Sequence, residues 1–335
     1  MMTDDTMATT MKAALVTRPG GPEVLTVRDV PRPKIKPGWS VVKVMGFGVN
    51  HSEIFTRQGL SPSVHFPRIL GIECVGVVEE SSDPNRLPTG TVVASLMGEM
   101  GRAFDGSYAQ YTLLPNDQIF PIKSDLPWPA LAAIPETFYT AFLAYRSLKI
   151  QEGDRILVRG GSSGVGIAFL HLVKARFPQI PISGSVRSLS KRERLLRAGF
   201  GRVLPDRNRK LILHDSDTFT KVLELIGPAT IKDSISHMEE GGIVCSAGQL
   251  GGIWYLQDFD PIMELQKTIY LTTAYSGRVT GETIQEMFDF IDRYQVPVEP
   301  EKVFTLDGIA QAHAYLEGKS SFGKVVVLPQ DKGEY

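Results

Sequence analysis

The sequence has very little cysteine, and its charges nearly cancel. Only Cys74 and Cys245 occur among 335 residues, which excludes a disulfide scaffold and a paired-cysteine zinc knuckle and fits a reducing compartment. Because the chain has 36 Lys and Arg residues and 37 Asp and Glu residues, its net charge is -1. We therefore expect neither a nucleic-acid partner nor binding to an acidic membrane surface.

Long apolar runs are also missing. No stretch approaches the ~20 apolar residues of a membrane-spanning helix, so no membrane partner is expected. Residues 1–10 are polar and carry two acids, unlike a signal or transit peptide, so we expect the working chain to begin near Met11. A cytoplasmic enzyme with two domains is the expectation from this length and composition.

The segment 155–170 has the pattern of a strand, a tight turn and a helix. Residues 156–158 form a short apolar run typical of a buried parallel strand. The turn follows a variant of the dinucleotide fingerprint, Gly161-x-Ser163-x-x-Gly166, in which glycines let the backbone approach a pyrophosphate at a helix N-terminus. On the motif alone, an ordinary strand-to-helix turn is the alternative. The turn residues that we assign to the cofactor are Gly161, Ser162, Ser163, Gly164 and Val165.

Two patterns divide the chain. Up to about residue 129, short β-rich runs broken by Pro and Gly predict an antiparallel, barrel-like lobe. Residues 130–276 alternate strands and helices, which predicts a doubly wound parallel α/β sheet of six strands, a Rossmann domain. Residues 277–335 do not continue this rhythm, so we expect them to join residues 1–129 in a β-rich catalytic domain. The expected strands of the parallel sheet are 155–159, 182–186, 202–204, 221–225, 242–247 and 269–274.

No acid stands at the end of the second of these strands. An NAD-selective site places Asp or Glu there, against the ribose hydroxyls. Arg187, Ser188 and Lys191, with Arg192 as a further candidate, instead offer positive charge and a hydroxyl to a 2'-phosphate. A capped, solvated helix start is the alternative, but basic groups at a helix N-terminus oppose its dipole. The prediction is therefore NADP(H).

Nearly the whole chain, residues 11–329, resembles the zinc-free, quinone oxidoreductase branch of the medium-chain dehydrogenase/reductase superfamily. The resemblance implies a GroES-like fold for the β-rich lobe and hydride transfer to a small molecule, a quinone or a related conjugated carbonyl. The blocks that carry it are 11–14, 20–25, Gly48-Val49-Asn50-His51-Ser52-Glu53, Arg57-Gln58-Gly59, 67–78, Gly106-Ser107-Tyr108-Ala109-Gln110-Tyr111, 132–137 and Gly323-Lys324-Val325-Val326.

Zinc-dependent relatives use a Cys in the active-site loop and a His in a Gly-His-Glu segment. The matching positions here hold Asn50 and Ile72, which cannot replace a thiolate and an imidazole, so no metal is expected. His51 and Glu73 stand beside them. We expect His51 to be a hydrogen-bonding loop residue and Glu73 to be the buried partner of a basic group.

The resemblance also implies roles for single residues. It places Asn50 near the nicotinamide and the substrate, and Thr137 on the carboxamide. Phe55 stands where a loop tyrosine of relatives could donate a proton, which favours an acceptor that needs no protein acid; a plain wall residue is the alternative. Gly248, after the fifth strand, and Lys324 complete the predicted cofactor residues.

The last strand of the parallel sheet, residues 269–274, is expected at its edge. An apolar edge invites pairing with its twin, which predicts a homodimer. Trp254 and Tyr255 either wall the pocket or form a lid or subunit contact. Two functions remain as alternatives to quinone reduction: an enone (double-bond) reductase and a non-catalytic NADPH-binding protein.

Overall fold

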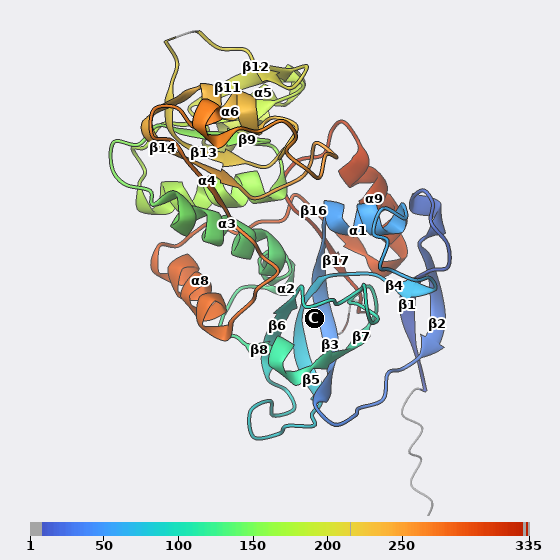
Figure 1. The fold of residues 1–335 in the computed structure, drawn as a ribbon. Helices are drawn as coiled ribbons and strands as arrows, with labels where there is room; N and C mark the ends of the chain where they lie inside the picture. The colour runs from blue at the N-terminus through green and yellow to red at the C-terminus, as the bar shows by residue number, and fades with distance from the viewer. Residues whose placement is uncertain (1–8, 215, 331–332, 334–335) are drawn as a thin grey trace, which may run out of the picture.

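Two seven-stranded sheets of opposite character organise the computed structural model, which describes residues 9–214, 216–330 and 333 (Figure 1). One sheet is mostly parallel and the other is mostly antiparallel, with a small three-stranded sheet beside the second. Most of the predicted polar leader, residues 1–8, lies outside the described residues. No helix in the described ranges has the length and apolarity that crossing a membrane requires.

The parallel sheet contains all six predicted strands, and they run parallel to one another. A seventh strand, the two-residue β12, joins the edge antiparallel; it was not predicted because two residues carry no periodicity. Strand order reverses beside β9, the switch point at which doubly wound sheets bind ligands. The order is β12 (Lys210–Leu211), β11 (Arg202–Arg207), β10 (Ile182–Val186), β9 (Ile156–Arg159), β13 (Phe219–Glu224), β14 (Met238–Ser246) and β15 (Tyr270–Thr273).

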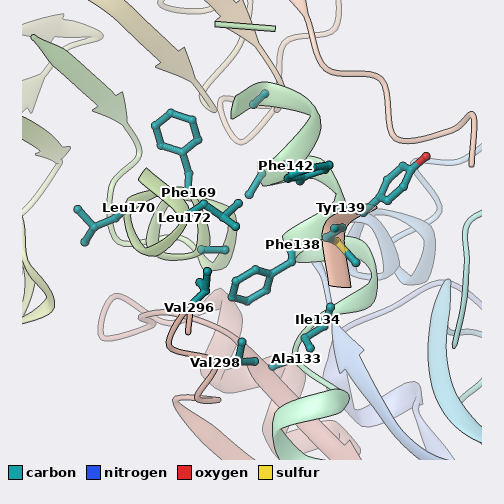
Figure 2. Packing of buried hydrophobic residues seen from close by; sticks show 14 of the residues in the cluster. Ala133, Ile134, Phe138, Tyr139, Phe142, Phe169, Leu170, Leu172, Val296 and Val298 are labelled. Carbon is teal, nitrogen blue, oxygen red and sulfur yellow. The ribbon is translucent and has the colours of Figure 1, made fainter. Parts of the chain in front are cut away.

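Both faces of this sheet are covered. Ile156 and Val158 of β9 belong to the core shared with α3 (Pro135–Leu148) and α4 (Gly164–Arg176), whereas Leu157 belongs to the core of α6 (Ile231–Ser236). Burial on both faces explains why β9 is continuously apolar. Figure 2 shows Phe138 of α3 pointing toward α4 and the segment that carries Val296 and Val298.

The antiparallel sheet is built around the long strand β3 (Trp39–Val49). The C-terminal strand β17 pairs with it antiparallel, Val325 opposite Val49, so the end of the chain returns to the first lobe and lies beside the Asn50 loop. The other strands of this lobe are β1 (Thr10–Val16), β2 (Thr26–Pro31), β4 (Arg68–Ile69), β5 (Glu73–Glu80), β6 (Val92–Leu96), β7 (Tyr111–Pro115), β8 (Phe120–Pro121), β16 (Lys302–Thr305) and β17 (Val325–Leu328).

The predicted helix near residues 282–294 is α8 (Gly281–Arg293), capped by the Thr280 hydroxyl, which accepts the N–H of Thr283 at 3.2 Å. Its apolar side is buried in the core that holds α3 and α4 (Figure 1). α8 packs in the half that holds α3 and α4, whereas β17 pairs with β3 in the other half. The predicted domain boundary at residue 277 therefore stays a prediction. The remaining helices are α1 (His51–Arg57), α2 (Trp128–Leu131), α5 (Arg192–Ala198), α7 (Pro261–Glu264) and α9 (Ile309–Glu317), with 3₁₀ turns η1 (Pro22–Val24), η2 (Asn116–Gln118), η3 (Leu189–Lys191) and η4 (Leu306–Gly308).

Candidate active site

The glycine turn between β9 and α4 is shaped by a serine. Ser163 is the N-cap of α4: its Oγ accepts the N–H of Gly166 at 3.1 Å and donates to the Gly160 carbonyl at 2.8 Å. This explains why the fingerprint departs from glycine there. A Cβ on Gly166 would lie 2.9 Å from the Gly160 oxygen, so the compact turn requires that glycine. The N–H groups of Gly164 and Val165 have no acceptor within the helix and fit a phosphate.

A loop of the other half of the molecule meets this turn. The N–H of Gly323 donates to the Ser162 carbonyl at 3.0 Å, and Ser163 forms an isolated parallel bridge with Gly323. Lys191 Nζ lies 2.5 Å from the Ser321 carbonyl oxygen and 3.4 Å from Ser162 Oγ. The predicted phosphate turn therefore lies at the boundary between the two halves.

The ribose edge beyond β10 carries several cations. Arg187 is exposed and has no partner among the residues that the structure describes. Burial lowers the pKa of Lys191, and the positive charges of Arg187 and Arg194 lower that pKa further. Arg194 is paired with Glu301 at 2.6 Å. Ser188 does cap a short turn, since its Oγ accepts the N–H of Ser190 at 3.4 Å, so the capped-turn alternative describes part of this segment.

A buried polar network holds Asn50. Lys324 Nζ lies 2.6 Å from both Asn50 Oδ1 and Glu73 Oε1, and Asn50 Nδ2 donates to Glu73 Oε1 at 2.8 Å. The prediction that Glu73 is the buried partner of a basic group is thereby confirmed, since the Glu73 side chain is fully buried and paired with Lys324. Lys324 is separated from Asn50 by 274 positions in the sequence, and only strand pairing brings them together.

Glu53 belongs to the same network and was missed by sequence reasoning. Its Oε1 accepts the N–H of Ile72 at 3.2 Å and lies 3.4 Å from Asn50 Nδ2, whereas its Oε2 is buried with no partner in the described chain. Burial raises the pKa of Glu53 to about 8, and the neighbouring Glu73 carboxylate contributes to the rise. Its place three residues after Asn50 on α1 was the available signal.

Three predicted cofactor residues share one small cavity. Thr137, Gly164 and Lys324 line about 20 Å³ of space between the starts of α3 and α4 and the loop before β17. Gly248, by contrast, approaches the backbone: a Cβ there would lie 2.5 Å from the Leu225 oxygen. The need for glycine at 248 is therefore explained by packing, and its contact with a cofactor stays a prediction.

Aromatic side chains join α1 to the segment after β14. The Phe55 ring on α1 meets the Trp254 ring edge to face, with centroids 5.2 Å apart, and so joins the two halves. This contact is what the wall interpretation of Phe55 requires. Tyr255 is 78% exposed and points away from the core.

At the two positions where zinc-dependent relatives have metal ligands, this chain has residues that are not zinc ligands. Asn50 is bonded to Lys324 and Glu73, and Ile72 is a buried apolar residue whose N–H donates to Glu53. In the part of the chain that the structure describes, no group of three or more His, Cys, Asp or Glu side chains is arranged to hold a metal.

Comparison with known proteins identifies the family and the fold. Residues 36–124 match the family described as alcohol dehydrogenase GroES-like domain, and residues 199–327 match the family described as zinc-binding dehydrogenase. The chain is 26% identical over 323 residues to the quinone oxidoreductase of Pseudomonas aeruginosa, covering 92% of this chain and 97% of the relative. Human quinone oxidoreductase is 26% identical over 343 residues, covering 95% and 98%.

The chain belongs to the quinone oxidoreductase branch of the medium-chain dehydrogenase/reductase superfamily. The predicted combination of a Rossmann sheet with a GroES-like lobe is confirmed, and this branch member is an NAD(P)-dependent oxidoreductase. Solved structures share the fold. An oxidoreductase from Salmonella enterica in complex with NADP has a TM-score of 0.82 at 20% identity, covering 96% of this chain and all of that one. The quinone oxidoreductase from Coxiella burnetii has a TM-score of 0.79 at 22% identity, covering 96% and 100%.

Proposed function

We propose that this oxidoreductase reduces a quinone or a related conjugated carbonyl with NADPH and without zinc. The observation that carries the proposal is the network of Asn50, Lys324 and Glu73, which stands where zinc-dependent relatives hold their metal. An amide and an ammonium ion offer zinc no thiolate or imidazole ligand. The buried carboxylate of Glu73 is already committed to Lys324 and to the N–H of Glu136 at 2.8 Å.

The residues fit a dinucleotide. NADPH supplies the hydride, so the protein has to hold it against the acceptor and exclude water. The free N–H groups of the glycine turn suit the pyrophosphate, and Thr137 and Lys324 suit the nicotinamide half because they line the adjoining space. We propose that Gly248 also contacts the nicotinamide half of the cofactor. The complete turn is Gly161, Ser162, Ser163, Gly164 and Val165.

The phosphorylated cofactor is favoured by electrostatics. Arg187, Lys191 and Arg194 gather at the ribose edge, and the positive charges of Arg187 and Arg194 lower the pKa of Lys191. Glu301 neutralises only Arg194. A 2'-phosphate would relieve this repulsion and accept hydrogen bonds from Arg187, Lys191 and the Ser188 hydroxyl, whereas the ribose hydroxyls of NAD would not.

Asn50 is held so that it can accept a hydrogen bond. Its amide hydrogens are directed to Glu73 Oε1 at 2.8 Å and Glu53 Oε1 at 3.4 Å, while its Oδ1 accepts from Lys324. An amide oxygen has two lone pairs, so one remains for a ribose or substrate hydroxyl. We propose that Asn50 orients the reactants and that Phe55 walls the acceptor space against Trp254.

We also propose a homodimer and a cytoplasmic location. The strand β15 is the edge of the parallel sheet, and its Tyr270 is 59% exposed, so the same strand of a second copy can pair with it across a two-fold axis. Light scattering should give a dimer mass, and Thr273→Pro, which removes an N–H that faces away from β14, should give a monomer. The two cysteines are buried and unpaired, which suits a reducing compartment.

The deciding experiment is an acceptor panel with protein dialysed against a chelator. NADPH oxidation is followed with 1,2-naphthoquinone, phenanthrenequinone, an enone and an aldehyde, and repeated with NADH. We expect turnover of the quinones, a preference for NADPH and no gain on adding zinc. Turnover restored only by zinc would refute the metal-free mechanism. Preference for the enone would favour the double-bond reductase, and tight NADPH binding without turnover would favour the non-catalytic alternative.

A further inference from the structure

Arg102 is a half-buried cation without an ion-pair partner among the residues that the structure describes. Its Nη2 donates to Ser52 Oγ at 2.6 Å, and its Nε is buried without a hydrogen-bond partner. Within the described ranges it forms no ion pair. Leaving a charged donor buried and unsatisfied destabilises a fold, so such a group in a native protein calls for a functional explanation.

The loop that carries Arg102 is held in an unfavourable backbone conformation. Met97 and Glu99 have φ angles of 61° and 69°, in the left-handed region that non-glycine residues avoid. The N–H of Met97 donates to the Ile72 carbonyl at 2.7 Å, and the N–H of Arg102 donates to the Glu99 carbonyl at 3.0 Å. A Cβ on Gly101 would lie 2.6 Å from the Gly71 oxygen. The strained loop is thus fastened beside Ile72, the position of a zinc ligand in relatives.

Arg102 also lies beside the helix that carries Phe55. Ser52, its hydrogen-bond partner, is two residues after Asn50 and three before Phe55, so Ser52 and Phe55 share one face of α1. Phe55 in turn contacts Trp254 of the other half. From the side of α3, burial raises the pKa of Glu136, and the positive charges of Lys324 and Arg102 oppose that rise. Arg102 therefore acts on both α1 and the start of α3.

We propose that Arg102, oriented by Ser52, is a catalytic residue that stabilises the negative charge on the acceptor oxygen during hydride transfer. The inference rests on the proposed function and specifies its acceptor: a conjugated carbonyl whose oxygen becomes anionic. The nicotinamide, which Thr137 and Lys324 would hold, would supply the hydride with its electron pair, and the π electrons of the acceptor would move onto its carbonyl oxygen. Water then supplies the proton that neutralises the anion. Arg102 stays protonated throughout and performs the electrostatic task of a metal ion.

The first test compares R102Q with a matched control. Arg28 likewise donates to a hydroxyl, that of Thr26 at 3.1 Å, but on the exposed strand β2. For 1,2-naphthoquinone, R102Q should lower kcat/KM by about 10²-fold, mainly in kcat, with an unchanged Kd for NADPH, whereas R28Q should match the wild type. R102K, which keeps the charge but not the planar fork, should recover part of the loss, and S52A should lose less than R102Q.

The outcomes separate the inference from the function on which it rests. Wild-type turnover with an equally active R102Q would overturn the role of Arg102 and leave the proposed function standing. A wild-type protein that reduces none of the quinones would refute both the role of Arg102 and the proposed function. A loss confined to the KM of an anionic acceptor, 1,2-naphthoquinone-4-sulfonate, would also overturn the inference, because Arg102 would then bind a substituent that is already charged.

A second readout needs no turnover. 4-Nitrocatechol absorbs visible light as its phenolate and imitates the oxygen anion of a reduced quinone. When it is bound to the wild type, its phenolate should form at a lower pH than when it is bound to R102Q, and R102K should lie between them. Identical titrations in the wild type and R102Q would show that no stabilisation of an oxyanion comes from Arg102. Because this assay reports only on bound protein, a variant that fails to fold is recognised by its lack of binding.

Discussion

The glycine turn with its ribose edge and the buried network around Asn50 are built in opposite ways. The turn and edge come from about thirty consecutive residues, and backbone groups and exposed cations form most of the site. The network joins Asn50, Glu53, Glu73 and Lys324 from distant parts of the chain and keeps Glu73 and Lys324 buried. Changes at the first should alter cofactor binding, whereas changes at the second should alter the stability of the whole fold.

The largest effect is expected from Lys324→Met. It would leave the Glu73 carboxylate buried without its cation, which destabilises a protein by about 3–5 kcal/mol. Urea unfolding would measure this loss, and adding Glu73→Gln to the variant should restore part of it. Lys12→Met, which breaks the exposed pair with Asp29, is the matched control and should unfold like the wild type. An unchanged midpoint in Lys324→Met would erase the contrast between the two regions.

Cofactor selectivity is the next largest effect. Replacing Arg187 and Lys191 together by Gln should weaken NADPH binding about a hundredfold or more, because each charge-assisted hydrogen bond contributes roughly 1.5–3 kcal/mol. The Kd for NADH should change little, since no 2'-phosphate is involved. Fluorescence titration of both cofactors provides the comparison. Equal weakening of NADPH and NADH would mean that the cations act on the shared pyrophosphate instead.

The pH dependence of stability should identify Glu53. Its pKa is about 8 in the folded protein, above the ordinary value of 4.5, so the folded state retains a proton that the unfolded state loses. Stability should therefore fall as the pH rises from about 4.5 to about 8. Glu53→Gln removes this pH dependence and should be more stable than the wild type near pH 8. Thermal melts at pH 5 and pH 8 would measure this, and a difference that did not grow with pH would contradict it.

The smallest effect is expected at the turn itself. Ser163→Gly restores the usual fingerprint but removes the side chain that caps α4, and a glycine cap costs only a few tenths of a kcal/mol. Ser163→Ala should cost about 1 kcal/mol, because alanine is a poor cap. Neither change should shift the Kd for NADPH much, since backbone N–H groups face the phosphates. A large loss of NADPH affinity in Ser163→Gly would show that the hydroxyl itself binds the cofactor.

Sequence patterns predicted most of the fold because the elements are strongly periodic. The apolar run before Gly160 and the amphipathic pattern of α8 are both present in the structure. The strand β12 was not predicted, since two residues form no pattern. In the site, Glu53 and Arg102 were passed over because a charged residue in a sequence is usually on the surface, and only packing shows that these two are enclosed.

By itself, the sequence determined the glycine turn, the cations after β10 and the absence of the usual metal ligands at Asn50 and Ile72, because each is a matter of residue type at nearby positions. The tertiary structure alone decided that Lys324 pairs with Glu73 and that Arg102 donates to Ser52. The physical reason is burial. The energy of a charge depends on the solvent and partners around it, and here the partners are 50 residues apart for Arg102 and 251 for Lys324.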